Sequence, residues 1–251
     1  MVPLGIDGNV ILFGGTNSAS SGGYSSDTWL YEKSKRQWTQ EFPSSSPAAR
    51  MYPAMGSLGV DGKIVLFGGS DKNTNNLVDT WIYDQKKKNW AHDNVKATIF
   101  SPKSRSVHRM ASLGESKVLL FGGVGADGHF LDSASTWIFN QKTSYWIEVK
   151  TTSSPSPSSR AQFAMALLEE SSNVILFGGS DGSTNLKDTW VFNQTDWIEI
   201  HPASPPSPRR SHAMASIGKS NNLVLFGGYD KLKFFQDTWI FNQSISDWIN
   251  I

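Results

Sequence analysis

Val10-Ile11-Leu12-Phe13-Gly14-Gly15 is an aliphatic run that ends in an aromatic residue and two glycines. The same phrase returns four more times, at residues 64–69, 118–123, 174–179 and 223–228. The first glycines of the pairs lie at positions 14, 68, 122, 178 and 227, so the repeat has a step of 49 to 56 residues. Self-similarity at this period predicts a propeller or a solenoid, in which neighbouring repeats bury one another's faces.

A second phrase, built on two tryptophans, follows each glycine pair. Its first half is Asp27-Thr28-Trp29, which returns at residues 79–81, 188–190 and 237–239 and has the variant Ser135-Thr136-Trp137. A second tryptophan closes each unit, and five units with two tryptophans each use all ten in the chain, so none is left for a unique site. The residues that we expect to be structural are Gly14, Gly15, Gly68, Gly69, Gly122, Gly123, Gly178, Gly179, Gly227, Gly228, Trp29, Trp38, Trp81, Trp90, Trp137, Trp146, Trp190, Trp197, Trp239 and Trp248.

These segments are typical of strands. The aliphatic runs are short, are rich in β-branched residues and end at glycine, which suits a strand buried on both faces. In the second unit we expect four strands, at about residues 53–59, 63–68, 80–84 and 89–94, from the alternation of strand and turn residues. The predicted fold class is all-β: a β-propeller of five four-stranded antiparallel blades in a single domain, 1–251. The expected blades are residues 1–45, 46–97, 98–152, 153–203 and 204–251.

The phrases resemble the kelch repeat, in which hydrophobic residues precede a double glycine, and an aromatic residue and a tryptophan follow. Six residues separate those two aromatics in four units, as in Tyr31 and Trp38, while the turn between Phe192 and Trp197 is two residues shorter. The resemblance covers the whole chain and implies a propeller whose innermost strand carries the double glycine. The chain begins inside the pattern of the first strand and ends after a last strand, so no strand is evident that would cross-stitch the ring. Two alternatives follow: five blades that close by packing of the last on the first, or part of a larger ring, since family members more often have six or seven blades.

Composition limits the partners. The net charge is +1, so no bulk attraction draws nucleic acid or an anionic membrane. The chain has no cysteine, which excludes disulfides and thiolate zinc sites and fits a reducing compartment such as the cytoplasm. We find no apolar run of the length of a membrane helix and no signal-peptide pattern at the N-terminus. No metal-ligand spacing or cofactor motif is evident, so we expect no cofactor and no metal.

Each linker between units carries the phrase Pro-x-x-Arg, and four arginines therefore recur at equivalent positions. If these linkers and the loops after the glycine pairs open on one face, the arginines form a cationic collar that could hold a carboxylate or phosphate. Alternatively, each arginine binds backbone carbonyls or the repeated aspartate of Asp-Thr-Trp, a structural role that repetition favours. The arginines are Arg50, Arg105, Arg160 and Arg209.

Other candidate binding residues lie near this face. His108 and His212 follow two of the arginines by three residues, where other units have Pro53 or Phe163, so a packed ring at the start of a strand is the plainer interpretation. The loops after the glycine pairs, at 16–26, 70–78, 124–134, 180–187 and 229–236, vary most, and repeats vary where the scaffold leaves positions free. Their aromatic and histidine residues are either anchors for a partner or cover for the blade tops. These residues are His129, Phe130, Tyr229, Phe234 and Phe235.

The leading hypothesis is a non-catalytic scaffold that binds a protein or peptide through the loop face around the channel mouth, because no nucleophile, base and orienting group recur together. The resemblance implies peptide partners that are often acidic. One alternative is a kelch-type enzyme such as an isomerase, with Arg105, His108 and a loop carboxylate in the channel mouth. Kelch-type copper oxidases need a cysteine, which is missing, and the acidic and histidine pattern of iron-dependent specifier proteins is absent. The other alternative is a fragment or an engineered repeat propeller with no dedicated ligand.

Overall fold

The structure, a computed structural model, describes the chain in eight stretches. They are residues 1–5, 7–16, 23–59, 61–93, 101–131, 136–150, 155–218 and 220–251. All regular elements of these residues are strands, which confirms the all-β fold class. Predictions for part of the first and third loops, for Ser135 and for the start of the linker at 151–159 lie outside the described residues.

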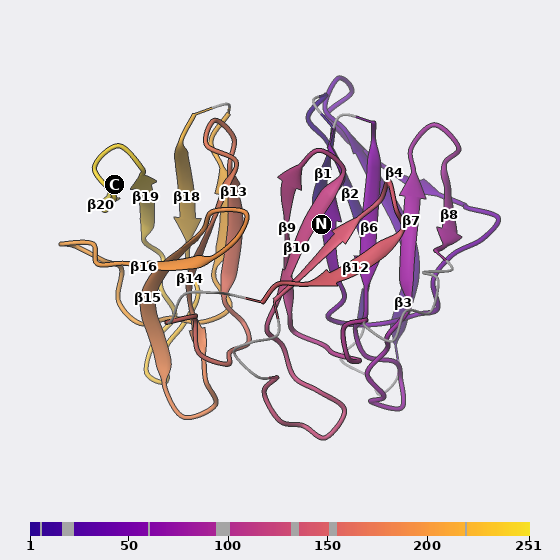
Figure 1. The fold of residues 1–251 in the computed structure, drawn as a ribbon. Helices are drawn as coiled ribbons and strands as arrows, with labels where there is room; N and C mark the ends of the chain where they lie inside the picture. Colours follow the sequence, from indigo (N-terminus) through magenta and orange to yellow (C-terminus); the bar gives the residue numbers. More distant parts are fainter. Residues whose placement is uncertain are drawn as a thin grey trace. The chain divides into compact units, whose positions relative to one another are not determined.

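The strands form five sheets of four strands each (Figure 1). Every sheet consists of four strands that are consecutive in the chain and pair antiparallel. The strands are β1 (Val2–Leu4), β2 (Asn9–Thr16), β3 (Tyr24–Glu32), β4 (Gln37–Glu41), β5 (Ala54–Ser57), β6 (Lys63–Phe67), β7 (Thr80–Asp84), β8 (Asn89–His92), β9 (Arg109–Gly114), β10 (Lys117–Phe121), β11 (Trp137–Asn140), β12 (Tyr145–Glu148), β13 (Ala164–Leu168), β14 (Asn173–Ser180), β15 (Asn185–Phe192), β16 (Trp197–Ile200), β17 (Ala213–Ser216), β18 (Asn222–Phe226), β19 (Thr238–Asn242) and β20 (Asp247–Asn250).

This strand order confirms the β-propeller fold class with five four-stranded antiparallel blades. The four strands expected in the second repeat are β5 to β8, and each falls within its predicted range. No described strand from one end of the chain joins a sheet at the other end, in agreement with the prediction that no strand cross-stitches the first and last blades. The assignment to a single domain and the blade bounds stay predictions.

The chain divides into two compact units. The first comprises Met1–Leu120, Val124–His129 and Trp137–Glu148, and the second comprises Phe121–Gly123, Phe130–Thr136 and Val149–Ile251. In the first unit, one buried cluster joins strands β1–β4 to β5–β8, and another joins β5–β8 to β9–β12. In the second, a cluster around Ile175, Leu225 and Trp248 joins β13–β16 to β17–β20. Each cluster is thus shared by consecutive repeats, as expected for blades that cover one another's faces.

One contact recurs within these units and is called here the Phe–Trp–Thr contact. The phenylalanine before a glycine pair packs against the second tryptophan of the next repeat, as Phe177 does against Trp248 at 5.1 Å between ring centroids. The indole Nε1 of that tryptophan donates a hydrogen bond of 3.1 Å to the threonine of the preceding Asp-Thr-Trp phrase, Thr189. The other three sets are Phe13, Trp90 and Thr28; Phe67, Trp146 and Thr80; and Phe121, Trp197 and Thr136. Four of the ten tryptophans therefore each bind two partners in the preceding repeat, which explains why the sequence repeats them.

Candidate functional site

The double glycines permit a close approach of two backbone segments. Gly178 has φ of +61°, and a Cβ at this position would lie 2.8 Å from the carbonyl oxygen of Arg209. The next residue, Gly179, donates its N–H to the same carbonyl at 2.9 Å. Gly14, Gly68 and Gly122 approach the carbonyls of Arg50, Arg105 and Arg160 in the same way. The backbone of each linker arginine is therefore fixed to the glycine pair of the preceding repeat.

The side chains of Arg50, Arg160 and Arg209 point into the following repeat. Arg50 is buried, and its Nη1 and Nη2 donate to the two carboxylate oxygens of Asp79 at 2.6 and 2.7 Å. Nη1 also donates to the carbonyl of Gly68 at 3.0 Å, and Asp79 accepts a further hydrogen bond of 2.7 Å from Trp81 Nε1. The same set recurs at Arg160, Asp188 and Trp190, and at Arg209, Asp237 and Trp239. We call each Arg–Asp–Trp set an arginine clamp.

The clamp shifts the ionisation of its carboxylates. Burial alone would raise the pKa of Asp79, but the hydrogen bonds and charge of Arg50 outweigh it and hold that pKa below its usual value. Hydrogen bonds from Arg209 lower the pKa of Asp237 to about 2. In the third repeat, where Ser135 replaces the aspartate, Arg105 is also buried, and burial lowers its pKa. The clamp geometry matches the structural role considered from the sequence, and a binding role for the four arginines stays a prediction.

The two linker histidines are packed rings at the start of a sheet. His108 and His212 are buried, and they lie edge-on against Phe67 and Phe177 at 5.8 and 5.5 Å between ring centroids. At the equivalent position Phe163 lies against Phe121 at 5.7 Å. Phenylalanine and histidine therefore occupy the same packed position, which fits the plainer interpretation of the two histidines.

Burial of His108 predicts acid sensitivity. Burial lowers the pKa of His108 well below its ordinary value of 6.5, and the charges of Arg105 and Arg109 lower it further. Because the pKa of His108 is depressed in the folded state, the neutral imidazole makes its full contribution to the folding stability above pH 6.5. That contribution is lost as the pH falls below 6.5. We expect His108→Phe, which introduces the phenylalanine found at the equivalent position 163, to reduce the loss of stability between pH 7.5 and 5.5 by about 1 kcal/mol. Urea unfolding at pH 7.5 and 5.5 measures this. The control is His129→Ala at an exposed histidine, and equal pH dependence of wild type and His108→Phe would contradict the prediction.

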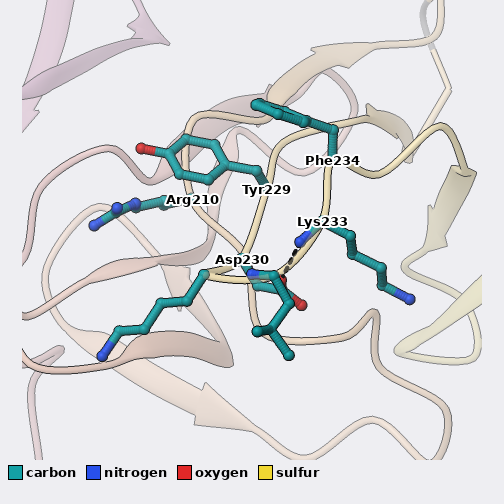
Figure 2. Close-up of a pocket in the computed structure, with 7 residues that line it drawn as sticks. Arg210, Tyr229, Asp230, Lys233 and Phe234 are labelled. Carbon is teal, nitrogen blue, oxygen red and sulfur yellow. Dashed lines mark hydrogen bonds between the residues drawn. The ribbon is translucent and has the colours of Figure 1, made fainter.

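The loop between β18 and β19 forms a surface site in the last repeat (Figure 2). Arg210 lies over the ring of Tyr229 at 4.7 Å, and Tyr229 contacts Phe234 at 5.5 Å between ring centroids. Asp230 shapes the loop, because its Oδ1 accepts the backbone N–H groups of Leu232 and Lys233 at 2.7 and 2.9 Å. These residues surround a hollow of about 390 Å³ and are called the β18–β19 loop site: Arg210, Tyr229, Asp230, Lys231, Leu232, Lys233 and Phe234.

Part of this site is built on a β-bridge that recurs in other repeats. Arg210 and Tyr229 pair as an isolated β-bridge, and the equivalent bridges join Met51 to Ser70, Ser106 to Val124 and Ala161 to Ser180. The last repeat therefore carries a cation and an aromatic ring where the other described bridges carry smaller or aliphatic side chains. Lys231 Nζ also donates to the carbonyl of Ser183 in the preceding repeat at 3.0 Å.

The structure brings some of the sequence candidates together and separates others. Tyr229 and Phe234 meet in the loop site. Phe235 is half-buried, and the Cζ of Arg209 lies 4.0 Å from the centroid of its ring. Phe130 lies against Gly182, where an added Cβ would meet its ring at 2.9 Å, and His129 is exposed in a turn capped by Asp127. The residues that the sequence did not single out are Arg210, Asp230, Lys231, Leu232 and Lys233. The signal that could have found Arg210 is its place directly after a repeated arginine, where the other linkers have Met, Ser and Ala.

Within the described stretches, no group of three or more histidine, aspartate or glutamate residues is placed to hold a metal ion. The same stretches contain no helix that is long and apolar enough to cross a bilayer.

The fold and the repeated clamp define a propeller protein of the kelch type. The family model for the KLHDC2/KLHL20/DRC7 Kelch-repeats domain matches residues 4–193 and 151–251, and the chain belongs to this family.

Three curated relatives illustrate the similarity. The chain is 30% identical to Adagio-like protein 1 of Oryza sativa subsp. japonica over 151 residues, which are 58% of this chain and 23% of the relative. It is 28% identical to Kelch domain-containing protein 1 of Mus musculus over 190 residues, 72% of this chain and 43% of the relative. It is 31% identical to tRNA wybutosine-synthesizing protein 4 of Emericella nidulans over 174 residues, 66% of this chain and 16% of the relative. The matched regions thus span less than half the length of each of these relatives.

Proposed function

We propose that this chain is a non-catalytic scaffold that binds a protein or peptide through the β18–β19 loop site. The observation that carries the proposal is the exposure of two large apolar side chains there, Leu232 at 93% and Phe234 at 82%. Both lie beside a hollow and an aromatic ring held by Arg210, so a partner could bury apolar surface without rearranging the loop.

The charge of the site favours an acidic partner. Arg210, Lys231 and Lys233 line the hollow, and the one carboxylate among the lining residues belongs to Asp230. Backbone hydrogen bonds from Leu232 and Lys233 lower the pKa of Asp230 and occupy its Oδ1. The cations therefore outnumber the anion, and a segment with an acidic residue beside an apolar one would complement both parts of the site.

Several observations support a binding role over a catalytic one. The residues that an isomerase could use, Arg105 and His108, are both buried away from solvent. The family is defined by kelch repeats, and one relative is named only for its kelch domain, although another is named for synthesising wybutosine in tRNA. The net charge of +1 favours a protein partner over nucleic acid or a membrane surface, and the lack of cysteine fits the cytoplasm.

A displayed library of random peptides tests the proposal. We expect the wild type to enrich peptides that carry Asp or Glu beside an aromatic or aliphatic residue. Phe234→Ser should weaken the binding of an enriched peptide by about tenfold to a hundredfold, since an apolar anchor contributes about 1.4–3 kcal/mol. Fluorescence polarisation measures the affinity, which should also fall with added salt.

The matched control is Val78→Ser, which removes an exposed apolar side chain from the loop of another repeat. This variant should bind the peptide as the wild type does. Failure to enrich any peptide, or equal binding by Phe234→Ser, would contradict the proposal. Both side chains are exposed, so the melting temperature should stay unchanged in either variant.

A further inference from the structure

The linker before β17 carries an exposed serine that is followed by a proline. Ser207 and Pro208 are both exposed, and the structure describes all of residues 201–209 and places no strand among them. Pro205, Pro206 and Pro208 have no N–H group, so none of them ties the linker to a neighbouring segment as a backbone donor. The Ser207 hydroxyl therefore lies on an irregular segment that an enzyme can reach.

The exposure of this position is common to the four linkers. The equivalent residues in the other linkers, Ala48, Lys103 and Ser158, are exposed as well. In each linker the backbone carbonyl of this residue accepts a hydrogen bond of 2.9–3.1 Å from Nε of the arginine two positions further on. The four linkers therefore hold this residue in the same way, whichever repeat follows.

The linker before β13 shows which group a serine hydroxyl meets at this position. Ser158 Oγ accepts a hydrogen bond of 2.9 Å from Nη2 of Arg160. Ser207 has the same relation to Arg209, whose Nε donates to the Ser207 carbonyl at 3.1 Å. A phosphoryl group on Ser207 would therefore lie beside a guanidinium, which binds phosphate oxygens through charge-assisted hydrogen bonds.

The residues that follow Ser207 distinguish it from the other serines of the linkers. Among the Ser-Pro pairs of the sequence, Ser207-Pro208 alone has a cation three positions after the serine, Arg210. The Arg210 guanidinium lies over the ring of Tyr229 at the surface (Figure 2). Proline-directed protein kinases bind the residue after the acceptor where a backbone N–H would lose its partner, and their carboxylates favour a cation nearby. Ser207 meets both requirements.

We propose that Ser207 is a phosphorylation site for a proline-directed protein kinase and that Arg209 binds the phosphate. In the transfer, Ser207 Oγ forms a bond to the γ-phosphorus of ATP, the bond between that phosphorus and the ADP oxygen breaks, and the hydroxyl proton passes to the base of the kinase. The product carries a charge of about −1.5 to −2 at neutral pH, next to the cation of the arginine clamp.

Incubation of the folded chain with a purified cyclin-dependent kinase, Mg²⁺ and ATP tests the site, and mass spectrometry locates the phosphate. We expect phosphate on Ser207. Pro208→Ala keeps the hydroxyl and restores an N–H, so it should slow the reaction at Ser207 by about tenfold or more. Ser158→Ala is the matched control, because it removes the serine at the same position of another linker, and it should leave the reaction at Ser207 unchanged. A wild type that takes no phosphate on Ser207, or a Pro208→Ala variant that reacts as fast, overturns the proposal.

A ³¹P NMR titration of the phosphorylated protein tests the contact with Arg209. A neighbouring guanidinium stabilises the phosphate dianion, so the second pKa of the Ser207 phosphate should lie below the value of about 6 that is usual for phosphoserine. The same phosphoprotein unfolded in urea is the control and should titrate near that usual value. Equal pKa values in the folded and unfolded protein would overturn the placement of the phosphate beside Arg209. Melting temperatures near that of the wild type confirm that the variants fold.

Discussion

Arg160→Met lowers the free energy of unfolding by about 3 kcal/mol, because it removes one partner of a buried ion pair. The guanidinium of Arg160 makes two hydrogen bonds of 2.6–2.7 Å to Asp188 and one of 3.2 Å to the carbonyl of Gly178. Without it, the Asp188 carboxylate keeps the hydrogen bond from Trp190 but loses two others and its counter-charge, and the Gly178 carbonyl loses the hydrogen bond from Arg160. Urea unfolding at neutral pH measures the difference.

Two further variants separate charge from packing. Lys187→Met removes an exposed cation from the same sheet and should change the stability by less than about 0.5 kcal/mol. Arg160→Met/Asp188→Leu removes both charges and should recover part of the loss, because an unpaired buried charge is more costly than an apolar pair. The structural role of the clamp is refuted by an Arg160→Met variant that unfolds no more easily than Lys187→Met.

Gly178→Ala lowers the free energy of unfolding by about 2–5 kcal/mol. Of this, about 1–2 kcal/mol arises from placing a Cβ in the left-handed region at a φ of +61°. The rest, about 1–3 kcal/mol, arises because the Cβ would lie 2.8 Å from the carbonyl oxygen of Arg209, a backbone atom that cannot turn aside. The linker would have to move, and the hydrogen bond from Gly179 to the same carbonyl would lengthen.

Gly227→Ala provides the matched control for this effect. Gly227 has a similar φ of +71°, but the nearest atom to an added Cβ is 3.6 Å away, which is an ordinary contact. This variant should lose only the left-handed strain of about 1–2 kcal/mol. Equal losses in both variants would show that the approach of the linker backbone adds nothing, whereas a larger loss in Gly178→Ala isolates its contribution.

The fold could be predicted from the sequence because its signal is repeated. Five aliphatic runs before a double glycine and five tryptophan pairs indicated the number of sheets and their strands. The partners of individual side chains were harder to predict. The sequence offered the repeated aspartate as one of two alternatives for the linker arginines. Arg50 and Asp79 lie 29 residues apart, and in the third repeat a serine replaces the aspartate while the arginine is kept, so the sequence alone did not decide between a structural pair and a binding role.

The candidate site was predicted only in part. Tyr229 and Phe234 stood out as aromatic residues in a variable loop. Arg210 belongs to a different segment and joins them only through the β-bridge to Tyr229, a contact that local sequence does not reveal. Leu232 has no equivalent in the other repeats, so the repeat pattern could not predict its exposure. That exposure depends on the turn that Asp230 caps. The repeats thus made the fold predictable from the sequence, whereas the contacts and exposure of the unrepeated residues could be learned only from the structure.

The arginine clamp also bears on how such a chain can change length during evolution. The members of this clamp lie in one linker and the repeat that follows it: Arg209 donates to Asp237, and Trp239 donates to the same carboxylate. Its backbone reaches back to the preceding repeat, where its carbonyl accepts from Gly179, a glycine that every repeat carries, and its N–H donates to the carbonyl of Leu186. Duplication of one linker together with its repeat would therefore copy a complete clamp and a ready acceptor for the next one. A duplication or deletion that separated Arg209 from Asp237 would leave a buried charge without its partner. Gains and losses of whole repeats are therefore favoured over partial ones.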